Sequence, residues 1–285
     1  MNVIDGLWHS TVMLPDYDEI LEPHRELFGA VVMHDQWMPK PEVGRRGGMI
    51  WIGDNSIEIG APLGDVSPIR KFVEKLGGMH SMALRTSDIE HTREWVLGHG
   101  AEQGVTIGDQ VFFTQVAGTA GLLLEWSEMQ TDDDPRFGFE PPFPRVERPV
   151  APALRYGFLT AAVADPVAAA ERLAELMDTE VLRSSPGVGP DQIGAMVSLR
   201  DCVLLLHSVP GSDADWPWTQ PPAKPRFHGQ GLEVEDLPAA LAALAEVGIE
   251  PVAELEHTVL LDPTRTPVPT FLCDRLFDED PRPAR

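Results

Sequence analysis

The chain has 285 residues, of which 43% are hydrophobic, and its formal net charge at pH 7 is -23. This length is typical of two domains of ordinary size, each with its own core. The negative charge repels phosphate backbones and anionic lipid surfaces, so neither nucleic acid nor a membrane is an expected partner. No apolar run approaches the roughly 18 residues that cross a bilayer, and no secretory signal is recognisable.

Two cysteines, Cys202 and Cys273, both lie in apolar runs and are compatible with buried thiols in a reducing compartment. Together with the missing secretory signal, they favour a cytoplasmic location.

The first half is predicted to begin with a unit of one strand, one helix and further strands. The segment WHSTVMLPD, residues 8–16, alternates as a strand does and ends at Asp16. An amphipathic helix follows and stops at Gly29. Two apolar stretches, GGMIWIG at residues 47–53 and NSIEIGA at residues 55–61, indicate later strands. The unit has the order βαβββ.

A second unit of the same order starts at residue 85. Its helix begins after Asp88 and stops at Gly100, and its later strands are QVFFTQVA, residues 110–117, and GLLLEWS, residues 121–127. In both units an aspartate precedes the helix, where its side chain can accept backbone N–H bonds as an N-cap. The first half therefore contains two modules.

The second half repeats the first with a shift of 148 residues, which relates the helix-capping aspartates Asp88 and Asp236, while Asp16 pairs with Asp165 at 149, one residue out. The chain is therefore expected to be a duplication of class α+β, built from four tandem βαβββ modules. The pairs at this shift are Pro62 and Pro210, Asp65 and Asp213, His80 and His228, Asp88 and Asp236, Gly100 and Gly248, and Glu102 and Glu250.

A segment rich in proline and charge separates the two halves. It runs over residues 130–152 and shows no periodicity, so we predict a linker there. The first domain is predicted to span residues 1–129 and the second residues 153–285.

Four βαβββ units in tandem resemble the vicinal oxygen chelate superfamily, which includes glyoxalase I, methylmalonyl-CoA epimerase, extradiol dioxygenases and bleomycin-resistance proteins. Residues 56–90 are similar to the epimerase segment that runs from the fourth strand through a short helix into the fifth. WHSTVMLPD and GLLLEWS are similar to its first and last strands. The resemblance covers residues 5–128 and implies that paired modules form curved, cup-like mixed sheets.

The resemblance also implies a divalent metal held by one residue from each of four strands. His9, Glu58 and Glu125 fall on three of these ligand positions. Imidazole and carboxylate ligands suit Mn, Co, Ni, Fe or Zn. Each of the three also interrupts an apolar strand, where an unpaired buried charge is costly.

At the fourth ligand position the family has a histidine and this chain has Ser81, with His80 beside it. Successive side chains of a regular strand point to opposite faces. Three alternatives stay open: a β-bulge turns His80 into the site, water completes a site of one histidine and two carboxylates, or the metal is absent. Because His228 repeats His80, a structural role for both is also open.

The catalytic base that the epimerase carries on its third strand is missing, because the nearest position here is Met49 or a neighbour. Glu58 or Glu125 could replace it, since burial can raise the pKa of a carboxyl group toward neutrality. The side chains expected to contact a small-molecule substrate are Trp8, Trp51, Ser81, Trp126, Arg45 and Arg46.

The second half is expected to lack metal ligands. At the shift of 148, Glu58 falls on Leu206 and Glu125 on Cys273, and the match to His9 is Gly157 or Phe158. This half is expected to pack against the first, close its pocket or mediate a homodimer. Five other histidines are expected to face solvent: His24, His34, His91, His99 and His257.

The resemblance favours a metal-dependent enzyme that transfers a proton on a small carbonyl or acyl-CoA-like substrate, as an isomerase, epimerase or lyase. An extradiol ring-cleavage dioxygenase is one alternative, and it requires His80 to turn inward. The other alternative is a metal-free protein that binds or sequesters a small hydrophobic molecule, as bleomycin-resistance proteins do.

Overall fold

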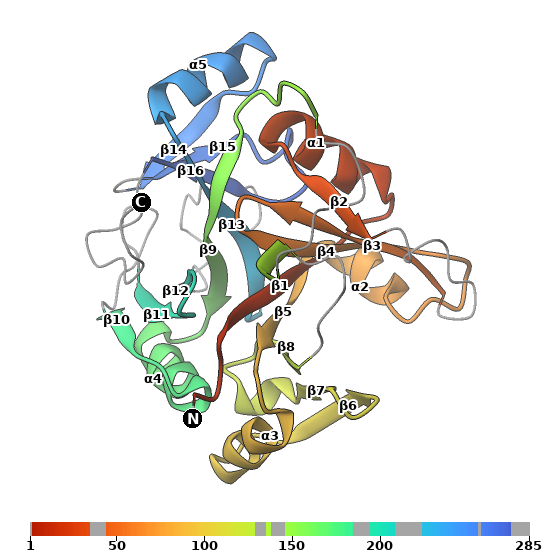
Figure 1. Cartoon of the computed structure of the whole chain (residues 1–285), viewed down its shortest axis with the longest axis vertical. Helices are drawn as coiled ribbons and strands as arrows, with labels where there is room; N and C mark the ends of the chain where they lie inside the picture. The colour runs from red at the N-terminus through yellow and green to blue at the C-terminus, as the bar shows by residue number, and fades with distance from the viewer. Residues whose placement is uncertain are drawn as a thin grey trace.

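The structure is a computed structural model that describes residues 2–34, 44–128, 135–137, 146–184, 194–208, 224–255 and 258–274. The chain forms two mixed sheets of eight strands, one from each half, with the longer helices outside them (Figure 1). The predicted α+β class is confirmed. No helix within the described ranges is long and apolar enough to span a membrane.

The first sheet follows the predicted module order twice. Its helices are α1 (Asp18–Phe28), a short α2 (Arg70–Lys75) and α3 (Ile89–Gly98), with 3-10 turns η1 (Val116–Gly118) and η2 (Pro135–Phe137). The strands are β1 (Gly6–Met13), β2 (Val31–His34), β3 (Arg45–Ile52), β4 (Asn55–Pro62), β5 (Gly78–Arg85), β6 (Gln103–Ile107), β7 (Val111–Thr114) and β8 (Leu124–Ser127).

The second sheet repeats this order with helices α4 (Pro166–Met177) and α5 (Leu237–Glu246). Its strands are β9 (Ala153–Val163), β10 (Val181–Ser184), β11 (Ala195–Ser198), β12 (Val203–Ser208), β13 (Arg226–Val234), β14 (Pro251–Leu255), β15 (Thr258–Leu261) and β16 (Thr270–Cys273).

Each sheet is assembled from two adjacent modules. The strand orders are β2-β3-β4-β1-β5-β8-β7-β6 and β10-β11-β12-β9-β13-β16-β15-β14. In the first sheet the opening strands of the two modules, β1 and β5, pair antiparallel at the centre, and β9 and β13 do the same in the second. The two sheets therefore have one topology, as a duplication requires.

Three of the four predicted N-caps are present. Asp88, Asp165 and Asp236 each accept a backbone N–H from the first turn of their helix. The prediction for Asp16 is wrong, because α1 begins two residues later and Asp16 accepts instead from the backbone N–H of Asp18 in a tight local turn.

One continuous apolar core joins the two halves. Across it, the hydroxyl groups of Ser10 and Tyr156 share a buried hydrogen bond of 3.0 Å. Each half also supplies an aspartate that binds the backbone of the other half. Asp201 of the second half accepts from the N–H of Leu7, and Asp54 of the first half accepts from the N–H of Tyr156, both over 2.8 Å. Each half thus fixes the first strand of the other.

His24 contributes to the same contact. It is fully buried in α1 and lies 2.9 Å from the amide nitrogen of Gln230 in β13. The prediction that His24 faces solvent is therefore wrong. Helical periodicity already placed it on the apolar side, beside Ile20 and Leu27.

Strand pairing identifies the second-half counterparts of the three candidate ligands. His9 pairs with Ser56 and Ala83, and Phe158 occupies the same place between Val203 and Gly231. By the same comparison Leu205 corresponds to Glu58 and Phe271 to Glu125, rather than the predicted Leu206 and Cys273. Phe158, Leu205 and Phe271 belong to one buried apolar cluster, so apolar side chains fill this place in the second sheet.

Tight packing of this cluster leads to a stability prediction. A Cβ atom on Gly231 would lie 2.1 Å from the ring of Phe158, so Gly231→Ala should lower the free energy of unfolding by about 1–3 kcal/mol. The matched control is Gly98→Ala in α3, where nothing lies within 4 Å of the added atom. Urea denaturation of both variants tests the prediction, and equal midpoints would contradict it.

Candidate functional site

The candidate residues lie on the face of the first sheet turned away from the shared core, which we call the site face. It is defined by His9 and Thr11 of β1, Glu58 of β4, Ser81 of β5 and Glu125 of β8. His9 pairs with Ala83, which in turn pairs with Glu125, while Thr11 stands between Glu58 and Ser81. Two adjacent rows of the sheet therefore bring these side chains together.

A β-bulge places His9 on this face. The register of β1 against β5 shifts between Leu7 and His9, so Leu7 points into the core while Trp8 and His9 both lie on the site face. His9 is 2% exposed, and neither ring nitrogen has a hydrogen-bond partner. Its Nε2 atom lies 3.6 Å from Oε2 of Glu58 and 4.0 Å from Oε2 of Glu125.

Glu58 is held by an arginine and a hydroxyl group. Nη2 of Arg45 lies 2.8 Å from Oε1, and the hydroxyl of Thr11 donates to Oε2 over 3.3 Å. Burial alone would raise the pKa of Glu58, but the contacts with His9, Arg45 and Thr11 lower it to about 2. Glu58 is therefore a carboxylate throughout the physiological pH range.

The surroundings of Glu125 raise its pKa, whereas those of Glu58 lower it. Glu125 is 7% exposed, and Nε2 of His9 lies 4.0 Å from its Oε2 atom. Burial raises the pKa of Glu125 to about 7, and the charge of Glu58 adds to this rise, while His9 and Arg45 oppose it. Near neutral pH both forms of Glu125 are populated, as a group that accepts and returns a proton requires.

A second bulge brings His80 to the same face as Ser81. The register of β5 shifts between Ser81 and Met79, and Nδ1 of His80 lies 3.2 Å from the hydroxyl oxygen of Ser81. The ring packs edge-on against Phe72 of α2. Burial lowers the pKa of His80. In the described part of the chain no carboxylate lies within 4.0 Å of His80. Its ring instead contacts Ser81 and Phe72, so His80 lies beside His9, Glu58 and Glu125 and not among them.

Two residues expected to contact substrate lie elsewhere. Trp126 is fully buried in the shared core, where its indole N–H donates to Thr114, because it alternates with Glu125 along β8. Arg46 alternates with Arg45 along β3 and lies over the ring of Tyr17, paired with Asp18 at 3.1 Å. We therefore remove Trp126 and Arg46 from the candidate site.

The other two predicted tryptophans line the site face beside His9. Trp8 and Trp51 form a small apolar cluster with Met33, Met49 and Ala83. Met49, directly opposite Glu58 in the strand register, stands near the place where the epimerase resemblance implies a base. The site face thus combines a charged group with an adjoining apolar wall.

Sequence reasoning missed two residues of this region. Thr11 carries a recognisable signal, since it is two positions after His9 on the same strand and shares its face. Arg136 of η2 lies over Trp51 and donates to the backbone oxygens of Leu7 and Trp8. No signal in the sequence pointed to Arg136, because it falls in the segment predicted as a linker.

The residues do not fit a metal site in the arrangement that the structure shows. The donor types of His9, Glu58 and Glu125 are suitable, and His9 has free ring nitrogens. Within the described ranges, however, no three side chains of His, Cys, Asp or Glu are grouped so that they could hold an ion. Arg45 and Thr11 already engage the two oxygens of Glu58. The metal implied by the resemblance stays a prediction.

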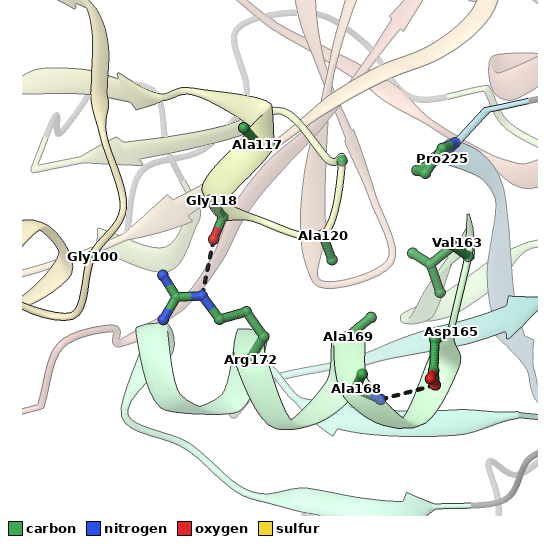
Figure 2. A pocket seen from close by; sticks show the side chains of 12 residues that line it. Gly100, Ala117, Gly118, Ala120, Val163, Asp165, Ala168, Ala169, Arg172 and Pro225 are labelled. Carbon is green, nitrogen blue, oxygen red and sulfur yellow. Dashed lines mark hydrogen bonds between the residues drawn. The ribbon is translucent and has the colours of Figure 1, made fainter.

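A groove between the two halves offers no comparable chemistry. Figure 2 shows Arg172 of α4 reaching the carbonyl oxygen of Gly118 across it, over 3.0 Å. Arg172 also pairs with Glu175, and Asp165 caps its own helix. The charged side chains that line this groove are thus occupied in structural contacts.

The pKa of Glu125 predicts how stability depends on pH. Because folding raises this pKa from 4.5 to about 7, Glu125 destabilises the fold progressively as pH rises from about 4.5 to 7. The Glu125→Gln variant lacks this loss, so its free energy of unfolding relative to wild type should rise by roughly 3 kcal/mol over that window. Urea denaturation at pH 4.5 and pH 8 checks this, and a constant difference between the proteins would contradict it.

Comparison with known proteins supports the same family as the sequence motifs. No family model matches the chain. An ethylmalonyl-CoA/methylmalonyl-CoA epimerase of Cereibacter sphaeroides is 29% identical over 136 residues, which are 45% of this chain and all of that protein. A mitochondrial methylmalonyl-CoA epimerase of Dictyostelium discoideum is 31% identical over 135 residues, or 44% of this chain and 79% of that protein.

A solved structure matches both halves at once. A mutant of 4-hydroxymandelate synthase from Streptomyces coelicolor superposes with a TM-score of 0.65 over 96% of this chain and 94% of that one, at 13% sequence identity. This likeness concerns the fold alone. The epimerase relatives, one of them 31% identical over 79% of its length, show that the chain belongs to the vicinal oxygen chelate superfamily and that its first half resembles methylmalonyl-CoA epimerase.

Proposed function

We propose that the first half is an enzyme that transfers a proton at a carbon atom next to a carbonyl group of a small molecule. The observation that supports this best is Glu125, a buried carboxyl group with a pKa of about 7 beside a buried histidine. A carboxylate without strong hydrogen-bond donors in a desolvated setting is a competent general base.

The proposed reaction needs only groups that the chain supplies. Glu125 takes the proton, the carbon–hydrogen bond breaks, and its electron pair moves toward the carbonyl oxygen, which becomes an enolate oxyanion. The same carboxyl group then returns the proton and the carbonyl is restored. Return to the same face restores the substrate, return to a neighbouring atom gives an isomer, and an epimer forms when the planar enolate turns over before Glu125 returns the proton. All three outcomes conserve atoms and electrons.

Arg45 is the group best suited to stabilise the oxyanion. Its guanidinium is permanently charged and lies at the edge of the site face, with 26% of the side chain exposed. Pairing with Glu58 fixes its position before substrate arrives, which is the form of electrostatic stabilisation that contributes most to catalysis. His9 lies between the two carboxylates, 3.6 Å from Glu58 and 4.0 Å from Glu125.

The substrate class follows from the neighbouring apolar wall and from the relatives. Trp8, Trp51, Met33 and Met49 suit an aliphatic or aromatic group attached to the reacting carbon. The names of the sequence relatives include acyl-CoA epimerases. We therefore propose an acyl thioester or a related small carbonyl compound.

The test is deuterium exchange in heavy water at pH 7. The purified chain is incubated with methylmalonyl-CoA, ethylmalonyl-CoA and a set of simple acyl thioesters, and mass spectrometry follows deuterium at the carbon next to the carbonyl. We expect catalysed uptake of one deuterium with at least one of them. Binding without exchange across the set would favour the alternative of a binding protein, and oxygen consumption would favour a dioxygenase.

A further inference from the structure

Arg45 and Glu58 form the shortest ion pair of the site face. Arg45 lies at the start of β3, opposite Pro62 of β4, and its side chain reaches along the sheet to Oε1 of Glu58 at 2.8 Å. The facing residues in between, Gly47 and Gly60, have no side chains to obstruct it. The arrangement is therefore built into the strands that carry the site.

This pair competes with any divalent ion for one carboxylate. An ion placed between His9, Glu58 and Glu125 would stand directly beside the guanidinium, and like charges in a region of low dielectric constant repel strongly. The guanidinium cannot relieve this repulsion by losing a proton.

We propose that Arg45 occupies the place of the divalent ion on the site face and keeps the affinity of the chain for such an ion low. Removing this one charge would release Glu58 to turn toward His9 and Glu125, and an imidazole with two carboxylates is a donor set that Mn, Fe, Co, Ni and Zn accept. Both ring nitrogens of His9 are buried without a hydrogen-bond partner, so His9 is available as a ligand.

The test is the binding of Co(II) to chains freed of metal with EDTA. Titration calorimetry and the visible absorption of bound Co(II) are measured on the wild type and on Arg45→Gln. We expect Arg45→Gln to bind one equivalent at least about tenfold more tightly than the wild type. Adding His9→Ala to that variant should abolish the gain, because the imidazole ligand is then missing.

Arg46→Gln is the matched control, since Arg46 is adjacent in sequence but faces Tyr17 and Asp18 on the other side of the strand. Its Co(II) affinity should equal that of the wild type. A gain in Arg46→Gln as large as in Arg45→Gln would overturn the proposal.

Two other results would also overturn it: tight Co(II) binding by the wild type, or no binding by folded Arg45→Gln. Should Arg45→Gln be unfolded after EDTA treatment, circular dichroism with added Co(II) decides the matter. Folding with one bound equivalent supports the proposal, and failure to fold with Co(II) contradicts it. The inference uses the same face as the proposed proton transfer, but its readout is metal affinity, so either can fail without the other.

Discussion

Glu125→Gln is expected to slow proton transfer by about 10²–10⁴-fold, which is the usual contribution of a general base. The amide has nearly the shape of the carboxyl group but cannot accept a proton. Because the amide still fills the same buried position, KM for the thioester should change little and the loss should lie in kcat. The deuterium-exchange rate under saturating substrate measures it directly.

The pH profile sharpens this expectation. The base must be ionised in the free enzyme, so kcat/KM of the wild type should rise with pH and level off above the pKa of Glu125, about 7. Glu94→Gln is the matched control, since Glu94 is exposed on α3 and outside the site. Full activity in Glu125→Gln, or equal losses in the two variants, would exclude Glu125 as the base.

Arg45→Gln is expected to lower the free energy of unfolding by roughly 2–4 kcal/mol at pH 7 without metal, because it removes the guanidinium that lies 2.8 Å from the buried charge of Glu58. The ion pair also affects how the stability of the fold changes at acidic pH. Since folding lowers the pKa of Glu58 from 4.5 to about 2, its stabilisation is complete above pH 4.5 and disappears as pH falls toward 2. Arg45→Gln should weaken this dependence.

Urea denaturation of a double variant separates charge from packing. Arg45→Gln/Glu58→Gln contains no uncompensated charge and should regain most of the lost stability, and Arg46→Gln, which removes an exposed pair, should change it by no more than about 1 kcal/mol. A double variant as unstable as Arg45→Gln alone would show that packing of the arginine side chain causes the loss.

The fold could be predicted largely from the sequence, because its strongest signals are local. The helices that begin after Asp88, Asp165 and Asp236 can be predicted from the capping aspartate and from the apolar periodicity that follows it. The duplication shows the same pattern in both halves of the sequence. The first cap was misplaced because a tight turn at Asp16 precedes α1. The two errors at the site, Trp126 and Arg46, were avoidable, since strict alternation with Glu125 and Arg45 already places them on the opposite face.

The rest of the site depends on pairing between distant strands. The bulges at Trp8 and His80 are shifts in the register of β1 against β5, and the sequence of neither strand contains a signal for them. The contact between Arg45 and Glu58 depends in the same way on the register of β3 against β4. The second-half counterparts of Glu58 and Glu125 lie one and two residues before the positions given by the constant shift, because the segments between the paired strands differ in length between the halves.

On both β1 and β9, one face of the strand contacts the other half of the chain and the opposite face points away from that junction. On β1, Ser10 and Leu7 join the halves while His9 serves the opposite face, and on β9, Tyr156 keeps the junction while Phe158 fills the place of His9. Mutations on one face of such a strand need not disturb the other. After a duplication, one copy could therefore lose its chemistry step by step while it continued to serve as a permanent internal subunit. This chain has the form of a two-fold dimer fused into one polypeptide, in which apolar side chains of the second half stand at the places of His9, Glu58 and Glu125.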